Sequence, residues 1–218
     1  NSVKNSDKNI NNILKLLSIL KKNGDMYYQK NIYDDAISYY LKYFDLSKIL
    51  NASNNNLTKS NTDELNYISI CYNLAQIYIT KKENQKAISY YNEILSLCKY
   101  YIDKNSETID FYKLYGMTLN SLGNLSYNNK DYLKASKYFE DSQNFFKDLI
   151  KEYPDNSEFV YMYGASFYNM GVVIKSFSNN ALGNKKLEEC KSALAKYPIS
   201  NNSDINNLIS KIDNALNQ

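Results

Sequence analysis

An internal repeat constrains the fold of this chain more than any other feature. Residues 111–123, with the sequence FYKLYGMTLNSLG, return as residues 159–171, FVYMYGASFYNMG, with Phe, Tyr, Gly and Gly in matching places. Repeated units at a fixed spacing bury their hydrophobic faces only against their neighbours. The repeat therefore predicts an array of similar units rather than a single compact core.

The offset that separates Gly123 from Gly171 relates further positions as well. Ala87, Ala135 and Gly183 follow one another at the same offset, whereas Ala36 precedes Ala87 by 51 residues. We place the extra residues in a loop at 51–61, which is rich in Asn. The chain is therefore predicted to hold four copies of the unit.

Within each copy the apolar residues recur with the spacing of a helix. The clearest stripe steps by three and four along residues 132–153, which predicts a helix of about six turns. No segment shows the sustained alternation of a half-buried strand. We therefore expect an all-α fold with no sheet.

The third copy carries a resemblance to a known family. Residues 122–135, LGNLSYNNKDYLKA, are followed by Tyr138 and Phe139 and resemble the tetratricopeptide repeat (TPR) signature. In that signature small residues let two antiparallel helices approach, and aromatic side chains fill the gap. Residues 33–40 and 87–91 resemble its second-helix part, whereas the fourth copy departs from it at Asn180 and Gly183.

The resemblance covers about residues 10–200 and implies helix pairs that stack into a right-handed superhelix. The usual TPR period is 34 residues, so a period of 48 adds about two turns to each helix. We expect a polar N-terminal tail at 1–9 and a capping helix at 203–218. Between them we expect four helix pairs, at about 10–50, 62–103, 106–153 and 157–197.

Composition argues against several classes of function. The chain has no His, and its three Cys have neither metal-ligand spacing nor a partner that would hold them as thiolates, so we expect no enzyme, metal or cofactor. The net charge of +3 comes from interspersed Lys and acidic residues, which does not favour a nucleic-acid partner. We expect no small-molecule substrate and no membrane span, because no apolar run is long enough.

The sequence leaves the compartment and the oligomeric state open. The chain begins at Asn1 without a Met. We favour the cytoplasm slightly. The alternative is export and membrane tethering after removal of an N-terminal signal.

In the family, ligand contacts lie on the first helix of each pair, along the concave wall. Asn can donate to and accept from a peptide backbone at once, and Tyr offers a flat apolar face with a polar tip. The resemblance therefore implies a peptide-binding groove. Its predicted residues are Lys21, Tyr28, Tyr72, Asn73, Gln76, Asn120, Asn124, Tyr127, Tyr168, Asn169 and Lys175.

Chaperone adaptors of this family grip a C-terminal carboxylate with Lys and Asn side chains. Lys21 and Asn73 fit that clamp, but Asp25, Met117 and Ser121 stand where Asn, Lys and a basic residue are required. We therefore predict a scaffold or adaptor that binds a protein or peptide segment, without this clamp. Two alternatives stay open: an assembly subunit that acts by self-association or its outer surface, and a signal-peptide sensor that lacks its effector domain.

Overall fold

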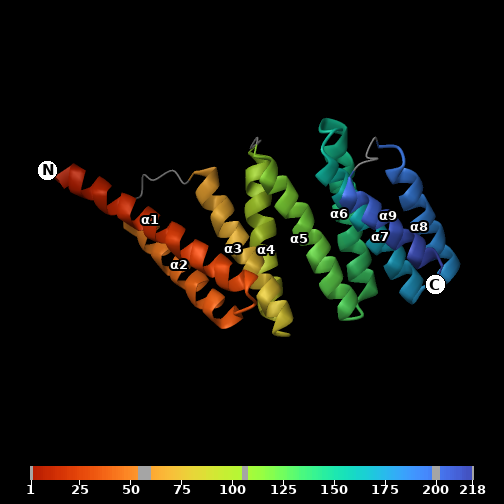
Figure 1. Ribbon diagram of the computed structural model, residues 1–218, viewed down its shortest axis with the longest axis horizontal. Helices are drawn as coiled ribbons and strands as arrows, with labels where there is room; N and C mark the ends of the chain where they lie inside the picture. The colour runs from red at the N-terminus through yellow and green to blue at the C-terminus, as the bar shows by residue number, and fades with distance from the viewer. Residues whose placement is uncertain (1, 54–59, 105–107, 198–201, 218) are drawn as a thin grey trace. The chain divides into compact units, whose positions relative to one another are not determined.

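The computed structural model describes residues 2–53, 60–104, 108–197 and 202–217, with side chains from residue 9 onward except those of 51–53 (Figure 1). Over these ranges the chain forms helices and no strand. The helices are α1 (Ser2–Gln29), α2 (Tyr33–Ser53), α3 (Asn61–Thr80), α4 (Asn84–Asp103), α5 (Ile109–Asn128), α6 (Tyr132–Glu152), α7 (Ser157–Phe177), α8 (Asn180–Leu194) and α9 (Ser203–Leu216).

In each of the first three helix pairs, the turn between the two helices has the same backbone geometry. Asn31, Lys82 and Lys130 each have a positive φ, of 59°, 61° and 62°. At Lys82 the backbone N–H donates to the Ile79 carbonyl, and the next N–H donates to the Tyr78 carbonyl. This pair of hydrogen bonds is the Schellman ending of a helix. The turns reverse the chain within a few residues, so α1–α2, α3–α4 and α5–α6 are antiparallel pairs (Figure 1).

The chain divides into two compact units, residues 1–97 and 98–218. In the first unit α1 packs on α2, and both contact α3. Side chains join α3 to α4: the rings of Tyr78 and Tyr90 stack with centroids 5.8 Å apart. Tyr40 and Tyr91 are fully buried within this unit.

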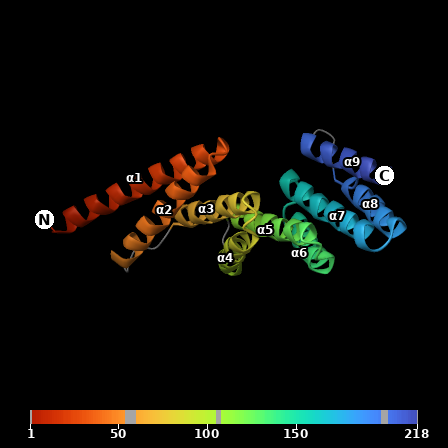
Figure 2. The ribbon, with the colours of Figure 1, turned by 90° about the horizontal axis from the view of Figure 1, so that it is seen from below.

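In the second unit α5, α6, α7 and α8 pack one on the next, and α9 lies against α7 and α8 (Figure 2). Ile205, Leu208 and Ile212 form the buried stripe of α9 and contact the core around Phe159 and Leu194. Asn202 caps α9, because its side-chain oxygen accepts hydrogen bonds from the N–H groups of the first turn. The capping helix therefore covers the apolar face that the last pair would otherwise expose.

Glycines allow the paired helices to approach closely. A Cβ atom at Gly123 would lie 2.5 Å from the Phe139 ring, and one at Gly171 would lie 2.7 Å from Leu187. The two glycines hold equivalent places in consecutive copies, as do the two side chains that fill their space. This finding confirms small residues as the contact points of the helix pairs.

The predicted all-α class of antiparallel helix pairs with a C-terminal capping helix is confirmed. The hand of the superhelix and the division into four repeats stay predictions. The segment expected as a polar tail, residues 1–9, lies within α1 from Ser2 onward. None of the described helices combines the length and the hydropathy that crossing a membrane requires.

Candidate interaction surface

The predicted groove residues all lie on the first helices of the pairs. Lys21 and Tyr28 belong to α1, and Tyr72, Asn73 and Gln76 belong to α3, both in the first unit. The second unit holds the others: Asn120, Asn124 and Tyr127 on α5, and Tyr168, Asn169 and Lys175 on α7.

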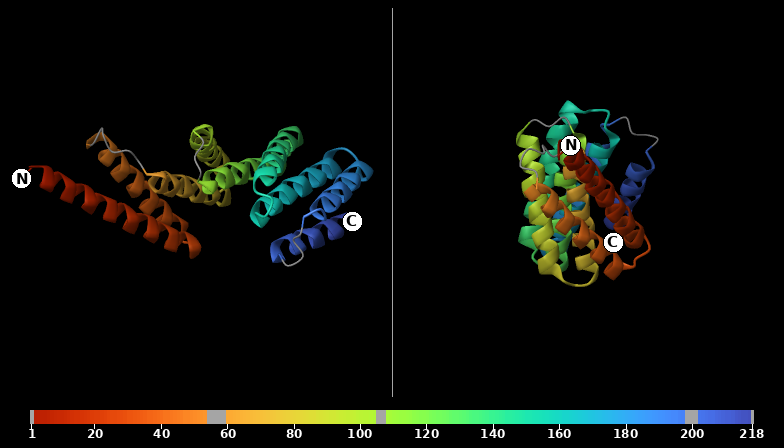
Figure 3. Two further views of the ribbon diagram at one scale, coloured as in Figure 1. Left: turned by 90° about the horizontal axis from the view of Figure 1, so that it is seen from above. Right: turned by 90° about the vertical axis from the view of Figure 1, so that its left-hand side faces the viewer.

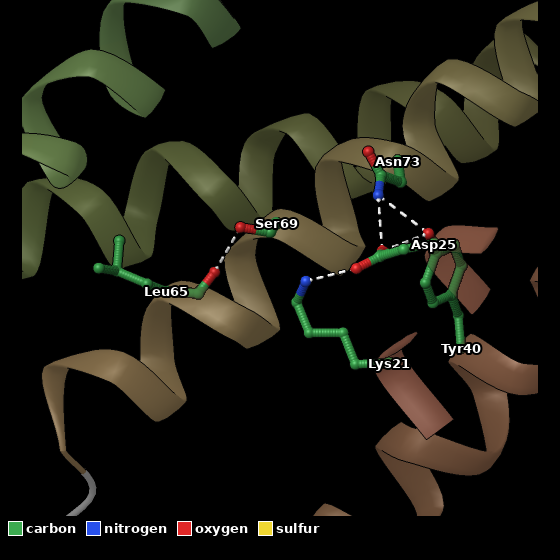
Figure 4. Close-up of polar contacts among 6 residues, drawn as sticks. All are labelled: Lys21, Asp25, Tyr40, Leu65, Ser69 and Asn73. Carbon is green, nitrogen blue, oxygen red and sulfur yellow. Dashed lines mark hydrogen bonds and ion pairs between the residues drawn. The ribbon is translucent and has the colours of Figure 1, made fainter. Parts of the chain in front are cut away.

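In the first unit a polar cluster joins α1, α2 and α3 around Asp25 (Figure 4). The Lys21 ammonium lies 2.6 Å from Asp25 Oδ2, one helical turn away. On Asp25 Oδ1 two donors converge: the Tyr40 hydroxyl at 2.8 Å and the Asn73 amide nitrogen at 3.3 Å. Asn73 also donates to the Tyr40 oxygen at 2.9 Å. The structure thus brings two predicted residues, Lys21 and Asn73, to one carboxylate.

Tyr40 completes this cluster, although it is not among the predicted groove residues. Its position opposite α1 depends on Gly24, because a Cβ atom there would lie 2.4 Å from the Tyr40 ring. Burial first, and then the hydrogen bond to Asp25, raise the pKa of Tyr40 above its usual value. The hydroxyl therefore stays protonated and donates to Asp25. The pairing of a small residue on one helix with an aromatic residue on the next could have indicated this contact.

The remaining predicted residues of α3 hold the next helix in place. Gln76 donates a hydrogen bond of 2.8 Å to the Tyr91 hydroxyl of α4, and the ring of Tyr72 contacts the same tyrosine at 5.9 Å. Tyr28 lies close to Tyr72 and Tyr33, and burial raises its pKa. Tyr28 and Tyr72 are therefore half-buried packing groups that expose only part of their surface.

In the second unit Asn120 points inward. It is 9% exposed, and its amide nitrogen donates to Ser166 Oγ of α7 at 2.9 Å. Ser166 in turn shares a hydrogen bond of 2.9 Å with Ser142 of α6. Within the described part of the chain, Asn120 Oδ1 has no hydrogen-bond partner. Asn120 therefore bridges helices in the core and presents little surface to a ligand.

Asn124 and Tyr127 lie further along α5. Asn124 is exposed, whereas the other members of the predicted set are buried or half-buried. The Tyr127 hydroxyl lies 3.0 Å from Ser176 Oγ of α7, and its ring contacts Tyr132. On the neighbouring helix Tyr168 packs partly against the core, and Asn169 is half-buried.

Lys175, predicted as a groove residue, has a structural role in attaching the capping helix. Its ammonium donates a hydrogen bond of 2.6 Å to the backbone carbonyl of Ala215, in the last turn of α9. A cation near the C-terminus of a helix is favourable, because the unsatisfied carbonyls there carry partial negative charge. Lys175 therefore holds the capping helix against α7.

A cleft of about 440 Å³ lies on the second unit between α6, α7 and α8. Its lining combines the apolar side chains of Met170 and Ile174 with acids and lysines. The ammonium of Lys186 lies 3.6 Å from Glu189 and 4.6 Å from the centre of the Phe167 ring. No sequence pattern indicated this cleft, because three helices build it. Its lining residues are Ser136, Glu140, Gln143, Met170, Ile174, Leu182, Lys185, Lys186 and Glu189.

The three cysteines are buried free thiols. Burial raises the pKa of Cys98 and Cys190 to about 12, and that of Cys71 above its usual range. A thiol with a raised pKa is a poor nucleophile at neutral pH. The cysteines therefore act as small packing groups.

Comparison with known proteins agrees with this architecture. Residues 68–101, which cover most of α3 and α4, match the sequence model of the tetratricopeptide repeat family. The chain thus carries TPR-like repeats, a class that generally mediates protein interactions and is typically non-enzymatic.

A solved structure with a helical-repeat fold is similar to this chain. It is the crystal structure of BtubC (BKLC) from P. vanneervenii, with a TM-score of 0.62 and 19% sequence identity. The match covers 86% of this chain and 68% of that protein. At this identity the likeness shows the fold alone. No curated protein matches the sequence.

Proposed function

We propose that this protein is a scaffold or adaptor module that binds a partner protein segment along its first helices. The observation that carries the proposal is the bridging of consecutive first helices within each unit. Asp25 and Asn73 join α1 to α3, and Asn120 and Ser166 join α5 to α7. Each unit therefore presents two first helices side by side, as a binding wall requires.

We also propose that the copies repeat with the period of 48 residues expected from the sequence. Lys82 and Lys130, which share a positive φ, are separated by this period, and so are Gly123 and Gly171. These equivalent positions support a common register for the copies. The segment that matches the family model, residues 68–101, falls within one such copy.

The chemistry of the wall favours an uncharged stretch of peptide. In Figure 4 the amide oxygen of Asn73 points away from Asp25, whereas its nitrogen is used within the cluster. An amide oxygen accepts a hydrogen bond from a peptide N–H. A ligand carboxylate would instead meet Asp25, whose charge already engages Lys21. We therefore expect internal peptide segments to bind and C-terminal carboxylates to be disfavoured.

The test is selection of peptides from a random display library on the purified chain, followed by affinity measurement with single variants. Asn124→Ala removes the exposed amide of α5, and Asn144→Ala removes an exposed amide of α6 as the matched control. A lost peptide hydrogen bond costs about 1 kcal/mol, which corresponds to roughly fivefold weaker binding.

The proposal predicts this loss for Asn124→Ala and unchanged affinity for Asn144→Ala. Equal effects of the two changes, or a selection that enriches no peptide, would contradict it. Asn73 is unsuitable for this test, because its replacement also removes hydrogen bonds to Asp25 and Tyr40.

A further inference from the structure

Exposed apolar side chains concentrate on the first helix pair. Six of the ten large apolar side chains exposed among the described residues lie between positions 16 and 49. Leu16 and Ile19 of α1 are 46% and 54% exposed, and Ile49 of α2 is 56% exposed. Single exposed apolar residues are ordinary, but a group on one pair of helices indicates an interaction surface.

Leu16, Ile19 and Ile49 lie on the flank of the pair that faces away from α3. At about 100° per residue, Ile19 is about 160° around α1 from Lys21, which belongs to the cluster with α3. On α2, Lys42 is likewise about 160° from Tyr40, whose hydroxyl contacts Asn73 of α3. We call this face the outer flank.

On α2 the outer flank forms a regular stripe. Asp35, Tyr39, Lys42, Leu46 and Ile49 alternate by four and three residues. This spacing keeps side chains in line along a helix and is the seam that pairs helices in coiled coils. The Tyr39 ring stacks on Tyr27 of α1 at 5.4 Å, so the two helices contribute to one continuous surface.

The last pair of helices shows how such a flank is normally covered. The apolar stripe of α9 packs on α7 and α8, and Ile205 and Ile212 are fully buried there. In Figures 1 and 3, α3 lies on one side of the α1–α2 pair, and no other described helix of residues 1–97 covers the opposite side. Uncovered end faces of repeat arrays expose apolar surface that a further helix can bury.

From the charges of the stripe we infer that the outer flank binds a second copy of the chain, as a twofold-symmetric dimer. Asp35 and Lys42 are both exposed and stand two helical turns apart, about 20° from one another around the helix. When two such helices pack antiparallel about a twofold axis between these positions, Asp35 of each copy meets Lys42 of the other. One contact forms two ion pairs, which is the self-complementarity of an isologous interface.

Neighbouring residues agree with this register. Asp34 forms an ion pair of 2.6 Å with Lys81 of α3, whereas Asp35 is exposed and belongs to the stripe of the outer flank. In the same antiparallel alignment Ile32, which is 44% exposed, lies nearly opposite Leu46 of the second copy along the helix axis. The flank thus combines an apolar contact with a charge pattern that selects its own copy.

The experiment is sedimentation equilibrium of the whole chain over a wide concentration range. The average mass is expected to rise from 25.3 kDa toward twice this value as the concentration increases. Asp35→Lys and Lys42→Asp each replace two attractions with two repulsions at the interface. Each single variant is expected to weaken dimerisation about tenfold. The two lost attractions and the two new repulsions together amount to about 1.4 kcal/mol.

The double variant Asp35→Lys with Lys42→Asp restores both pairs in reverse and is expected to dimerise like the original chain. Lys48→Asp is the matched control, because this exposed lysine lies about 120° around α2 from Lys42. Ile19→Asp tests the apolar part of the flank and is expected to abolish the dimer with an unchanged helical spectrum.

Three results would overturn the inference. A mass of 25.3 kDa at every concentration would mean that no second copy binds, and that another protein or another segment covers the flank. A dimer that tolerates both single charge reversals would place the contact elsewhere. Failure of the double variant to restore the dimer would exclude the proposed register. None of these results depends on whether the first helices bind peptide.

Discussion

Gly123→Leu tests the closest helix contact of the second unit. A Cβ atom at this position would lie 2.5, 2.7 and 2.8 Å from three ring atoms of Phe139. The ring is 1% exposed and packs in a cluster with Ala135, Met170 and Val173, so it has no free space to turn into. A leucine must therefore separate α5 from α6 or distort both helices.

The expected cost follows from two opposing effects. Overpacking of a core costs roughly 1–3 kcal/mol, and leucine with four side-chain carbons falls at the upper end. Replacing glycine within a helix recovers about 1 kcal/mol of intrinsic propensity. The net loss is about 2 kcal/mol, which lowers the unfolding temperature by roughly 4–8 °C in a chain of this length.

The assay is thermal unfolding followed by circular dichroism in the far ultraviolet. Asn124→Leu is the matched control, because it adds the same side chain to the adjacent, exposed position and is expected to change stability by less than about 0.5 kcal/mol. Phe139→Ala in the Gly123→Leu background removes the clashing ring, so the double variant is expected to lose less stability than the sum of the two changes. An unfolding temperature at or above the original, or strict additivity with Phe139→Ala, would refute the contact.

Three further predictions concern charge and backbone. Burial raises the pKa of Tyr43 to about 12 from the usual 10.0, so the folded chain keeps a proton that the unfolded chain releases. The contribution of Tyr43 to the free energy of unfolding is therefore expected to fall by about 1.4 kcal/mol per pH unit from pH 10 to 12. In Tyr43→Phe this contribution is missing, so the free energy of unfolding is expected to decline less steeply with pH. The measurement is urea unfolding at a series of pH values. Lys82→Gly removes the strain of a residue with a Cβ atom in the left-handed region, but glycine also gives the unfolded chain more conformational freedom. The net effect is expected to raise the free energy of unfolding by about 0.5 kcal/mol, measured by urea unfolding. Lys175→Met removes the bond to the Ala215 carbonyl and is expected to speed amide exchange in the last turn of α9, measured by mass spectrometry.

Each of these predictions has a contradicting result. An equally steep decline of stability in Tyr43→Phe and in the original chain would mean that Tyr43 titrates freely in the folded state. A loss of stability in Lys82→Gly would show that the lysine side chain contributes more than its backbone costs. Unchanged exchange near residue 215 in Lys175→Met would assign the attachment of α9 entirely to its apolar stripe.

Much of the fold could be predicted from local patterns. The apolar spacing along residues 132–153 corresponds to α6 (Tyr132–Glu152), and the stripe beginning at Ser203 corresponds to α9. These patterns are readable because a helix brings every third and fourth residue to one face, whatever surrounds it. The glycines at 123 and 171 were likewise recognisable, since a glycine within a helix has no intrinsic advantage there and indicates close packing.

The candidate site was only partly predictable. The predicted groove residues follow from their positions in the repeat, and the structure places all of them on the first helices of the pairs. Their use as ligand contacts stays a prediction. Asn120, Gln76 and Lys175 turn out to bond within the protein. A helical register tells which face a residue occupies, but not how deep that face lies beneath its neighbours.

The sequence by itself determined the helices, their pairing and the places where they approach most closely, because these depend on residues near one another in the chain. Only the tertiary structure decided which polar groups meet. The cluster of Asp25, Tyr40 and Asn73 joins residues from three successive helices, and Asp25 and Asn73 are 48 positions apart in the chain. Its hydrogen bonds depend on ångström-scale distances between those helices. The exposed outer flank of α1 and α2 also became visible only there, because exposure depends on which helices pack against a face and which do not.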